Sequence, residues 1–136
     1  MPLSSLGWDS IFASSFEIHS RAGLVPARVG ADLGPLFRLM GADGERLGEP
    51  SGRLRHGAAS RAELPAVGDW VAASPQPGER AVIHAVLPRR TCFSRKTAGA
   101  TVEQQVVAAN VDTVFLMTGL DGNFNPRRIE RALLLA

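Results

Sequence analysis

The sequence predicts a mainly β protein, built around a small closed barrel of five strands. Two observations carry this prediction. Between residues 24 and 87, five short segments mix apolar and polar positions, as half-buried antiparallel strands do, and turn residues separate most of them. After residue 110 one segment is apolar on both faces, which is typical of a central parallel strand covered by helices. We therefore expect a barrel followed by the start of an α/β domain.

A short helix is expected ahead of the barrel, over about residues 9–22. Asp9 fits the N-cap position, and apolar side chains recur near helical spacing from Ile11 to Phe16. Gly23 fits the position that follows the last helical turn. We expect Trp8, just before the helix, to anchor it on the barrel.

The five expected strands lie between this helix and residue 87. Ala42-Asp43-Gly44 is typical of a hairpin tip, and Pro26 indicates an edge or a bulge in the first strand. Among small barrels of this kind, the OB-fold is the commonest that binds nucleic acid, and we predict it here; an SH3-like barrel or a small β-sandwich fits the same pattern. The expected strands are Leu24–Gly30, Pro35–Met40, Arg46–Arg55, Val67–Ala73 and Arg80–Leu87.

The remainder of the sequence predicts the start of a second domain. Residues 88–110 show no strand pattern, and the two-sided apolar strand is expected over Val111–Gly119. A helix with Asn125 as its N-cap follows and meets no stop signal. Because one strand and one helix cannot bury their own apolar faces, we expect this domain to be incomplete in the sequence. The predicted domains are an OB-fold domain over residues 1–96 and, over residues 97–136, a linker with the start of a truncated α/β domain.

Composition excludes several kinds of site. Cys92 is the only cysteine of the 136 residues, so no internal disulfide forms and a reducing compartment is expected. One cysteine and three scattered histidines do not form a zinc motif. No apolar run approaches the roughly 20 residues that span a membrane, and the N-terminal stretch lacks the features of a secretory leader. We expect a cytoplasmic monomer without membrane contact.

Positive charge is concentrated in the middle of the chain. Residues 51–98 hold eight basic side chains and three carboxylates, whereas the stretches on either side are slightly acidic. Fourteen of the fifteen basic residues are arginine, which binds phosphate through paired hydrogen bonds. Arginines near a barrel rim can neutralise RNA phosphates, although a solvated linker explains the same charges. The predicted RNA-binding residues are Arg53, Arg55, His56, Arg89, Arg90, Arg95 and Lys96.

Other conspicuous side chains are expected to be structural. We expect Trp70 in the core or at the rim, and Phe93 packed at the domain junction, with stacking on an unpaired base as the alternative. His84 lies within an expected strand, and neither Ser60 nor Cys92 has a base beside it in sequence. The sequence contains neither a G-x-x-x-x-G-K-[ST] phosphate loop nor a G-x-G-x-x-G motif. We therefore expect no catalytic, cofactor-binding or metal-binding residue in this chain.

Several short segments follow one another from residue 6 to the end of the chain in a characteristic order and spacing. They are Leu6-Gly7-Trp8-Asp9, Pro26-Ala27-Arg28-Val29, Ser51-Gly52-Arg53-Leu54-Arg55, Val67-Gly68-Asp69-Trp70-Val71, Ile83-His84-Ala85-Val86-Leu87-Pro88-Arg89-Arg90, Phe93-Ser94-Arg95-Lys96, Glu103-Gln104-Gln105-Val106-Val107-Ala108-Ala109-Asn110-Val111-Asp112 and Phe124-Asn125-Pro126-Arg127-Arg128-Ile129-Glu130-Arg131. Together they resemble the N-terminal part of the ribosome-small-subunit-dependent GTPase A family, the circularly permuted GTPases of bacterial ribosome maturation.

The resemblance implies an OB-fold that docks on small-subunit ribosomal RNA, and a GTPase domain that hydrolyses GTP during late maturation of that subunit. In the family, the guanine-specifying N-K-x-D motif precedes the phosphate loop, and a zinc-binding module follows. The present sequence contains none of these motifs. GTP, magnesium and zinc are therefore implied for the full-length family, without ligands in this chain. Asn110 and Asp112 match the A-N-x-D segment at the domain entry, and we interpret them as structural.

Three functions stay open at this point. The chain is the front of a ribosome biogenesis GTPase, or a stand-alone RNA-binding barrel without enzymatic activity, or a barrel that serves only protein interaction or oligomerisation. Salt separates the last two, because RNA binding through arginines weakens steeply as salt rises. We expect no GTPase activity from these residues alone, since the loop that holds the phosphates is absent.

Overall fold

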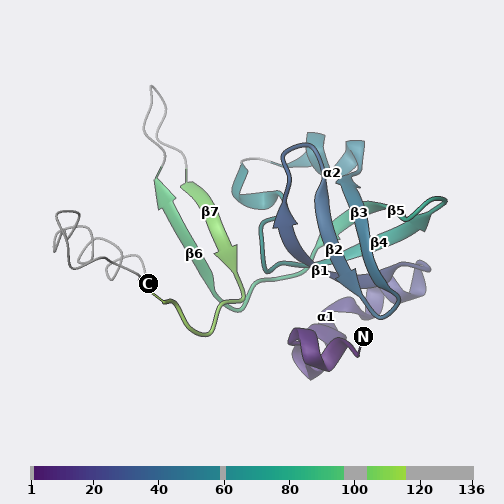
Figure 1. Cartoon of the computed structure of the whole chain (residues 1–136), viewed down its shortest axis with the longest axis horizontal. Helices are drawn as coiled ribbons and strands as arrows, with labels where there is room; N and C mark the ends of the chain where they lie inside the picture. The colour runs from purple at the N-terminus through teal and green to yellow at the C-terminus, as the bar shows by residue number, and fades with distance from the viewer. Residues whose placement is uncertain (1, 59–60, 97–103, 116–136) are drawn as a thin grey trace, which may run out of the picture.

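The computed structural model describes residues 2–58, 61–96 and 104–115, and its centre is a closed five-stranded barrel (Figure 1). The protein is mainly β, as predicted. The barrel strands are β1 (Val25–Asp32), β2 (Phe37–Gly41), β3 (Gly44–Pro50), β4 (Trp70–Gln76) and β5 (Arg80–Val86). The other elements are η1 (Leu3–Leu6), α1 (Ser10–Arg21), α2 (Gly52–Gly57), η2 (Arg61–Glu63), β6 (Cys92–Lys96) and β7 (Gln104–Ala109), where η marks a 3-10 helix.

The strand order is that of an OB-fold. β1, β2 and β3 form an antiparallel meander, β5 lies between β3 and β4, and β4 closes the ring onto β1. β3 and β5 are parallel, so β4 begins at the end of the barrel where β3 stops. α2 and η2 lie in the connection between β3 and β4, and therefore at that same end. The closed Greek-key barrel confirms the OB-fold prediction over the sandwich alternative.

Local irregularities allow the sheet to close. The expected hairpin tip is present between β2 and β3, where Gly44 has φ 107°, a conformation that favours glycine. The pairing of β1 with β2 shifts between Val29 and Ala31, and such a bulge bends and twists a strand. Pro26 pairs opposite Ala72 near the start of β1, so the bulge falls later in the strand than this proline.

The barrel interior is the first of two hydrophobic cores. Inward-facing side chains of β1, β2, β4 and β5 form it. β3 contributes Gly48, where the absence of a Cβ leaves room for the Leu39 side chain. The buried members are Ala27, Val29, Phe37, Leu39, Val71, Ala73, Ala81 and Ile83. Leu54 of α2 packs against this cluster, so α2 covers one end of the barrel.

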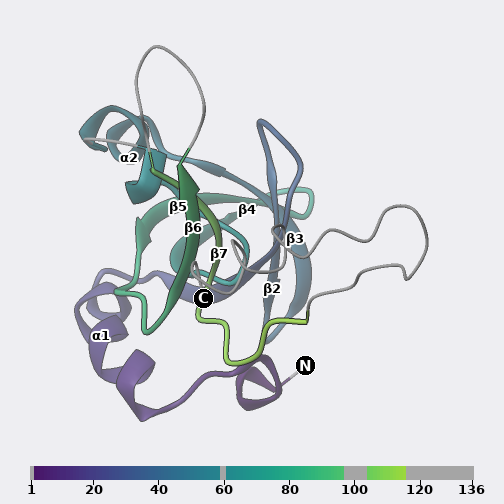
Figure 2. The same cartoon turned by 90° about the vertical axis from the view of Figure 1, so that its left-hand side faces the viewer.

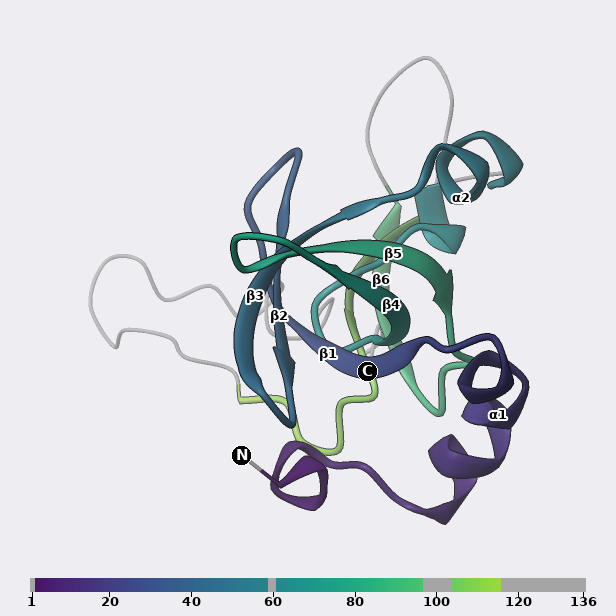
Figure 3. The same cartoon turned by 90° about the vertical axis from the view of Figure 1, so that its right-hand side faces the viewer.

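The second core lies outside the ring, between α1 and β4 (Figure 3). Phe12 and Phe16 of α1 pack on Trp70, and Trp8 makes an edge contact with Trp70 at 4.7 Å between ring centroids. The Asp9 carboxylate accepts hydrogen bonds from the N–H groups of residues 11 and 12, at 3.0 and 3.1 Å, and so caps α1. The expected helix, its cap, and the roles of Trp8 and Trp70 are confirmed.

The third predicted strand, Arg46–Arg55, was too long. β3 ends at Pro50, and the Ser51 N–H makes the last bond to β5, to the Ile83 carbonyl at 2.8 Å. The Ser51 hydroxyl then accepts a hydrogen bond from the Leu54 N–H at 3.1 Å and caps α2. Arg53 and Arg55 therefore lie on a helix at the barrel end, not at the end of a strand.

The absence of strands predicted for residues 88–110 was also wrong. β6 and β7 form an antiparallel hairpin beside the barrel, with Cys92 opposite Ala109 (Figure 1). The alanines and glutamines of β7 have weak strand propensity, which explains why the sequence did not show it. The Ala109 N–H donates to the Val67 carbonyl at 2.8 Å, so the hairpin is tied to the loop before β4. β6 ends at Lys96, the last residue of the predicted first domain, and β7 lies within the predicted second one.

Only the start of the predicted second domain is described. Residues 111–115 form no strand, and the rest of the expected strand to Gly119 and the helix after Asn125 lie outside the described residues. Within the residues that the structure describes, no helix is long and apolar enough to cross a membrane.

Candidate nucleic-acid interface

α2 carries three of the predicted RNA-binding residues at one end of the barrel. The side chains of Arg53, Arg55 and His56 are all exposed, while Leu54 of the same helix turns inward. In the described part of the chain, none of these three side chains forms an ion pair or a hydrogen bond. The charges of Arg53 and Arg55 are therefore available to a ligand outside the protein.

Arg89, also a predicted RNA-binding residue, forms its contacts within the protein. Its Nε and Nη2 each donate to the fully buried carboxylate of Asp69 at 2.8 Å. The same guanidinium donates to the carbonyls of Ala62 at 2.6 Å and Leu64 at 3.0 Å. Hydrogen bonding to Asp69 raises the pKa of Arg89 above its ordinary value, against the opposing effect of burial. These contacts use most of the donors of a guanidinium, so Arg89 fastens η2 and the loop before β4.

Arg90 is engaged as well, although it is more exposed. Its guanidinium pairs with the Asp9 carboxylate at 2.5 Å and lies 5.9 Å from the ring centre of Phe12. Its backbone N–H donates to the Asn110 side chain at 2.8 Å. Arg90 therefore connects α1 to the segment that leaves the barrel.

Four of the predicted residues are close in sequence but divided in space: Arg89 and Arg90 on one side, Arg95 and Lys96 on the other. Arg95 and Lys96 lie at the far end of β6, and the rise of a strand puts Lys96 about 13 Å from Cys92. Figures 1 and 2 show that this end of β6 points toward the same end of the molecule as α2. The backbone therefore brings the Arg95–Lys96 end of β6 toward the α2 arginines and leaves Arg89 and Arg90 at the other end of the strand.

Arg28 has a structural role that the sequence did not reveal. Its guanidinium donates to three carbonyls from distant segments, those of Leu6 at 2.5 Å, Gly68 at 3.0 Å and Asn110 at 2.9 Å. It also lies 5.9 Å from the ring centre of Trp70. Burial lowers the pKa of Arg28 from its ordinary value, and nearby carboxylates oppose this shift. No motif signals this role, because it depends on the register that places Arg28 opposite Trp70.

Asn110 completes this junction. It has φ 56°, and its side chain donates to the Gly68 carbonyl at 3.0 Å while accepting from the Arg90 N–H. Asparagine tolerates this left-handed conformation better than most residues. Asp112 raises the pKa of Arg28 by its charge. The contacts of Asn110 agree with its structural interpretation.

The other candidate side chains are those of Phe93, Cys92, His84 and Ser60. Phe93 is half-buried and Cys92 is exposed. His84 is exposed on β5, where its Nε2 lies 2.9 Å from the Ser74 hydroxyl. Among the described residues, no group of three or more histidine, cysteine or carboxylate side chains could hold a metal ion. Ser60 lies outside the described residues.

No family model matches the chain. It is, however, similar to curated proteins named small ribosomal subunit biogenesis GTPase RsgA. The protein of Opitutus terrae is 50% identical over 145 residues, covering 100% of this chain and 40% of the relative. That of Syntrophotalea carbinolica is 48% identical over 143 residues, covering 99% and 39%. That of Xanthomonas oryzae pv. oryzae is 60% identical over 73 residues, covering 54% and 19%.

The barrel defines an OB-fold protein with a basic helix at one end. The chain is homologous to the N-terminal part of proteins named small ribosomal subunit biogenesis GTPase RsgA. It spans about two-fifths of the length of these two relatives, and the resemblance stated from the sequence is confirmed.

Proposed function

We propose that this chain is the RNA-binding part of a ribosome biogenesis GTPase and that its barrel docks on the ribosomal RNA of the small subunit. The observation that carries this proposal is the pair of exposed arginines on α2, Arg53 and Arg55, which lie at one end of an OB-fold and have no partner among the described residues. Unpaired guanidiniums can bind phosphate without breaking a contact within the protein. The names of the relatives supply the small ribosomal subunit as the partner.

The proposed contact surface consists of α2 and the far end of β6. Arg53, Arg55 and His56 would contact phosphates, joined by Arg95 and Lys96. The phosphate contacts first predicted for Arg89 and Arg90 would have to compete with their ion pairs to Asp69 and Asp9. We therefore assign Arg89 and Arg90 to the support of the surface and not to the surface itself.

GTP hydrolysis is proposed for the full-length protein and not for these residues. The 136 residues contain neither N-K-x-D nor a phosphate loop, so GTP, magnesium and zinc would bind elsewhere in such a protein. The barrel would position the enzyme on the subunit, in the cytoplasm and as a monomer. The chain alone should hydrolyse no GTP above background.

Co-sedimentation with purified small subunits tests the docking proposal. The chain should pellet with small subunits at low salt and not with large subunits. Arg53→Ala with Arg55→Ala should lower the bound fraction several-fold, because each phosphate contact adds to affinity. Arg21→Ala, on the exposed surface of α1, is the matched control and should bind normally. A chain that fails to pellet at low salt, or a double variant that binds like the wild type, would contradict the proposal.

A second candidate is a stand-alone RNA-binding module without any enzymatic partner domain. The closed barrel, with its own two cores, favours this possibility. The two proposals differ in specificity: the module would bind structured RNAs generally, whereas the ribosomal proposal requires preference for the small subunit. Competition with unrelated structured RNA in the same experiment separates them.

A further inference from the structure

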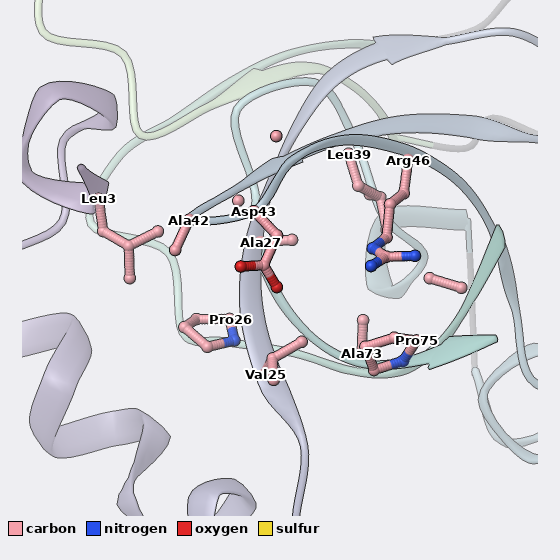
Figure 4. Close-up of a pocket in the computed structure, with 13 residues that line it drawn as sticks. Leu3, Val25, Pro26, Ala27, Leu39, Ala42, Asp43, Arg46, Ala73 and Pro75 are labelled. Atoms are coloured by element: carbon pink, nitrogen blue, oxygen red, sulfur yellow. The ribbon is translucent and has the colours of Figure 1, made fainter. Parts of the chain in front are cut away.

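The barrel is open at the end opposite α2. This end is formed where β1, β3 and β5 begin and β2 and β4 stop, and it contains a pocket of about 140 Å³ (Figure 4). The wall is mostly apolar and includes Pro26, Ala27, Leu39, Ala73, Pro75 and Ala81. Because α2 covers only the other end, the interior of the barrel is accessible from here.

Two charged side chains, Asp43 and Arg46, lie over this apolar opening. Arg46 is directly opposite Leu39 in the pairing of β2 with β3, so it points to the inner face of the sheet. Asp43 lies at the hairpin tip, and in Figure 4 its carboxylate and the Arg46 guanidinium both face the opening. In the part of the chain that the structure describes, neither side chain forms an ion pair or a hydrogen bond. The pocket thus offers an unused donor and an unused acceptor.

A second, shallower hollow of about 390 Å³ adjoins the pocket, since Arg46 lines both. Arg38 pairs opposite Leu47, and Leu47 pairs opposite Arg80, so the two arginines stand on the outer face on either side of this leucine. Both are exposed and unpaired among the described residues. Glu45 and Glu79 line the same hollow, which leaves it with one net positive charge when Arg46 is included.

We propose that the open end of the barrel binds one unpaired pyrimidine base of an RNA strand, whose backbone passes over Arg38 and Arg80. This inference rests on the proposed RNA-binding function and adds a second contact, at the other end of the barrel from α2. The base would enter the pocket, where Arg46 donates to a ring acceptor and Asp43 accepts from a ring or amino N–H. Arg38 and Arg80 would neutralise the flanking phosphates.

The chemistry of the pocket favours a base over a bare phosphate. A carboxylate beside an arginine repels an anion, whereas a nucleobase carries both hydrogen-bond donors and acceptors on one planar apolar ring. A cavity of this size accommodates one six-membered ring, since an engineered apolar cavity of about 150 Å³ binds benzene. A single ring therefore fits, and the two-ring purines are disfavoured. Cytosine suits the site because a carboxylate accepts from its amino group.

Fluorescence anisotropy with three labelled RNA probes tests this inference. The probes are a tetramer of cytidines, a tetramer of adenosines, and an abasic tetramer with the same phosphates. The wild-type chain should bind the cytidine tetramer about five- to tenfold more tightly than the abasic one, because a well-placed pair of hydrogen bonds distinguishes bases by that order. Arg46→Leu and Asp43→Ala should each remove most of this preference.

The phosphate contacts and the folding of the variants are checked separately. Arg38→Ala and Arg80→Ala should weaken all three probes alike and reduce the salt dependence of binding, by about 0.7 in the slope per contact for single strands. Arg21→Leu on α1 is the matched control and should change nothing. Addition of cytidine 5′-monophosphate should shift the amide signals of Ala27, Ala73 and Ala81 in the NMR spectrum of the wild type and not in that of Arg46→Leu, whose remaining signals report that it is folded.

The outcomes distinguish this inference from the proposed function. If small subunits bind through Arg53 and Arg55 while the wild type shows no preference for cytidine over the abasic probe, the pocket assignment is wrong and the docking proposal stands. A preference that survives Arg46→Leu also overturns the pocket assignment. If the wild type binds neither RNA probes nor small subunits, both are wrong.

Discussion

Asp69 is buried completely, and its carboxylate is matched by donors on every side. It accepts from both Nε and Nη2 of Arg89 and from the Ala66 N–H at 2.8 Å. From the sequence, Arg89 was a candidate phosphate ligand, and Asp69 was not singled out. The two are twenty positions apart, and nothing in either local pattern indicates that they meet. The pairing of such buried charges depends on the tertiary fold. The role of each residue therefore cannot be predicted from its neighbours in the sequence.

Substitution of Arg89 by alanine should destabilise the fold. Arg89→Ala leaves the Asp69 charge buried without its partner and frees the carbonyls that it held, so we expect the free energy of unfolding to fall by about 3 kcal/mol. Urea denaturation followed by circular dichroism measures this. The control, Arg55→Ala on exposed α2, should stay within about 0.5 kcal/mol of the wild type. Equal stability of the two variants would mean that Arg89 does not hold the fold together.

Gly68 is a second position where the structure requires one particular residue, glycine. Its φ is 94°, and a Cβ there would overlap the backbone carbonyl of Ala109. Gly68→Ala should therefore destabilise the protein more than a substitution at a glycine that has only a positive φ. Gly23→Ala is the matched control, because Gly23 has φ 82° with open space around it, and we expect it to cost about 1 kcal/mol. Thermal melts compare the two; similar losses would show that the contact between Gly68 and β7 is not close.

At the scale of elements, the helix and the barrel strands could be predicted and the connections could not. Alternation and turn residues revealed four of the five strands within a few residues, because half-buried strands have a period of two. The third was extended into α2, because the cap at Ser51 depends on one hydroxyl. The β6–β7 hairpin was missed, since its pairing joins segments separated by a long connection and the alanines and glutamines of β7 have little strand preference.

α1 allows a test of how an element is attached. Asp9 both caps the helix and pairs with Arg90, and the two roles can be separated by substitution. Asp9→Asn keeps the cap and loses the charge, so it should cost little, because partly exposed ion pairs contribute about 0–1 kcal/mol. Asp9→Ala loses both and should cost about 1–2 kcal/mol in thermal melts. If Asp9→Asn is as damaging as Asp9→Ala, the ion pair, and not the cap, attaches the helix.

At the scale of the whole molecule, the arginines fall into two sets: some hold segments of the protein together, and others face solvent. Arg28, Arg89 and Arg90 hold the N-terminal segment, the barrel and the exit at Asn110 in one arrangement. Among the described residues, Arg53 and Arg55 have no ion pair at one end of the barrel, and neither do Arg38, Arg46 and Arg80 at the other. The sequence predicted that the middle of the chain is basic, but only the fold shows which guanidiniums are available. The homology rests on the relatives, and the composition alone predicted no ribosomal partner.

The most direct test of this account is the salt dependence of binding to the small subunit. The logarithm of the affinity should fall linearly with the logarithm of the salt concentration, and Arg53→Ala with Arg55→Ala should reduce the slope by about 1.5 to 2, close to one unit for each lost phosphate contact. Arg21→Ala should leave the slope unchanged. A wild-type affinity that is insensitive to salt, or an unchanged slope in the double variant, would contradict the claim that α2 binds the ribosomal RNA.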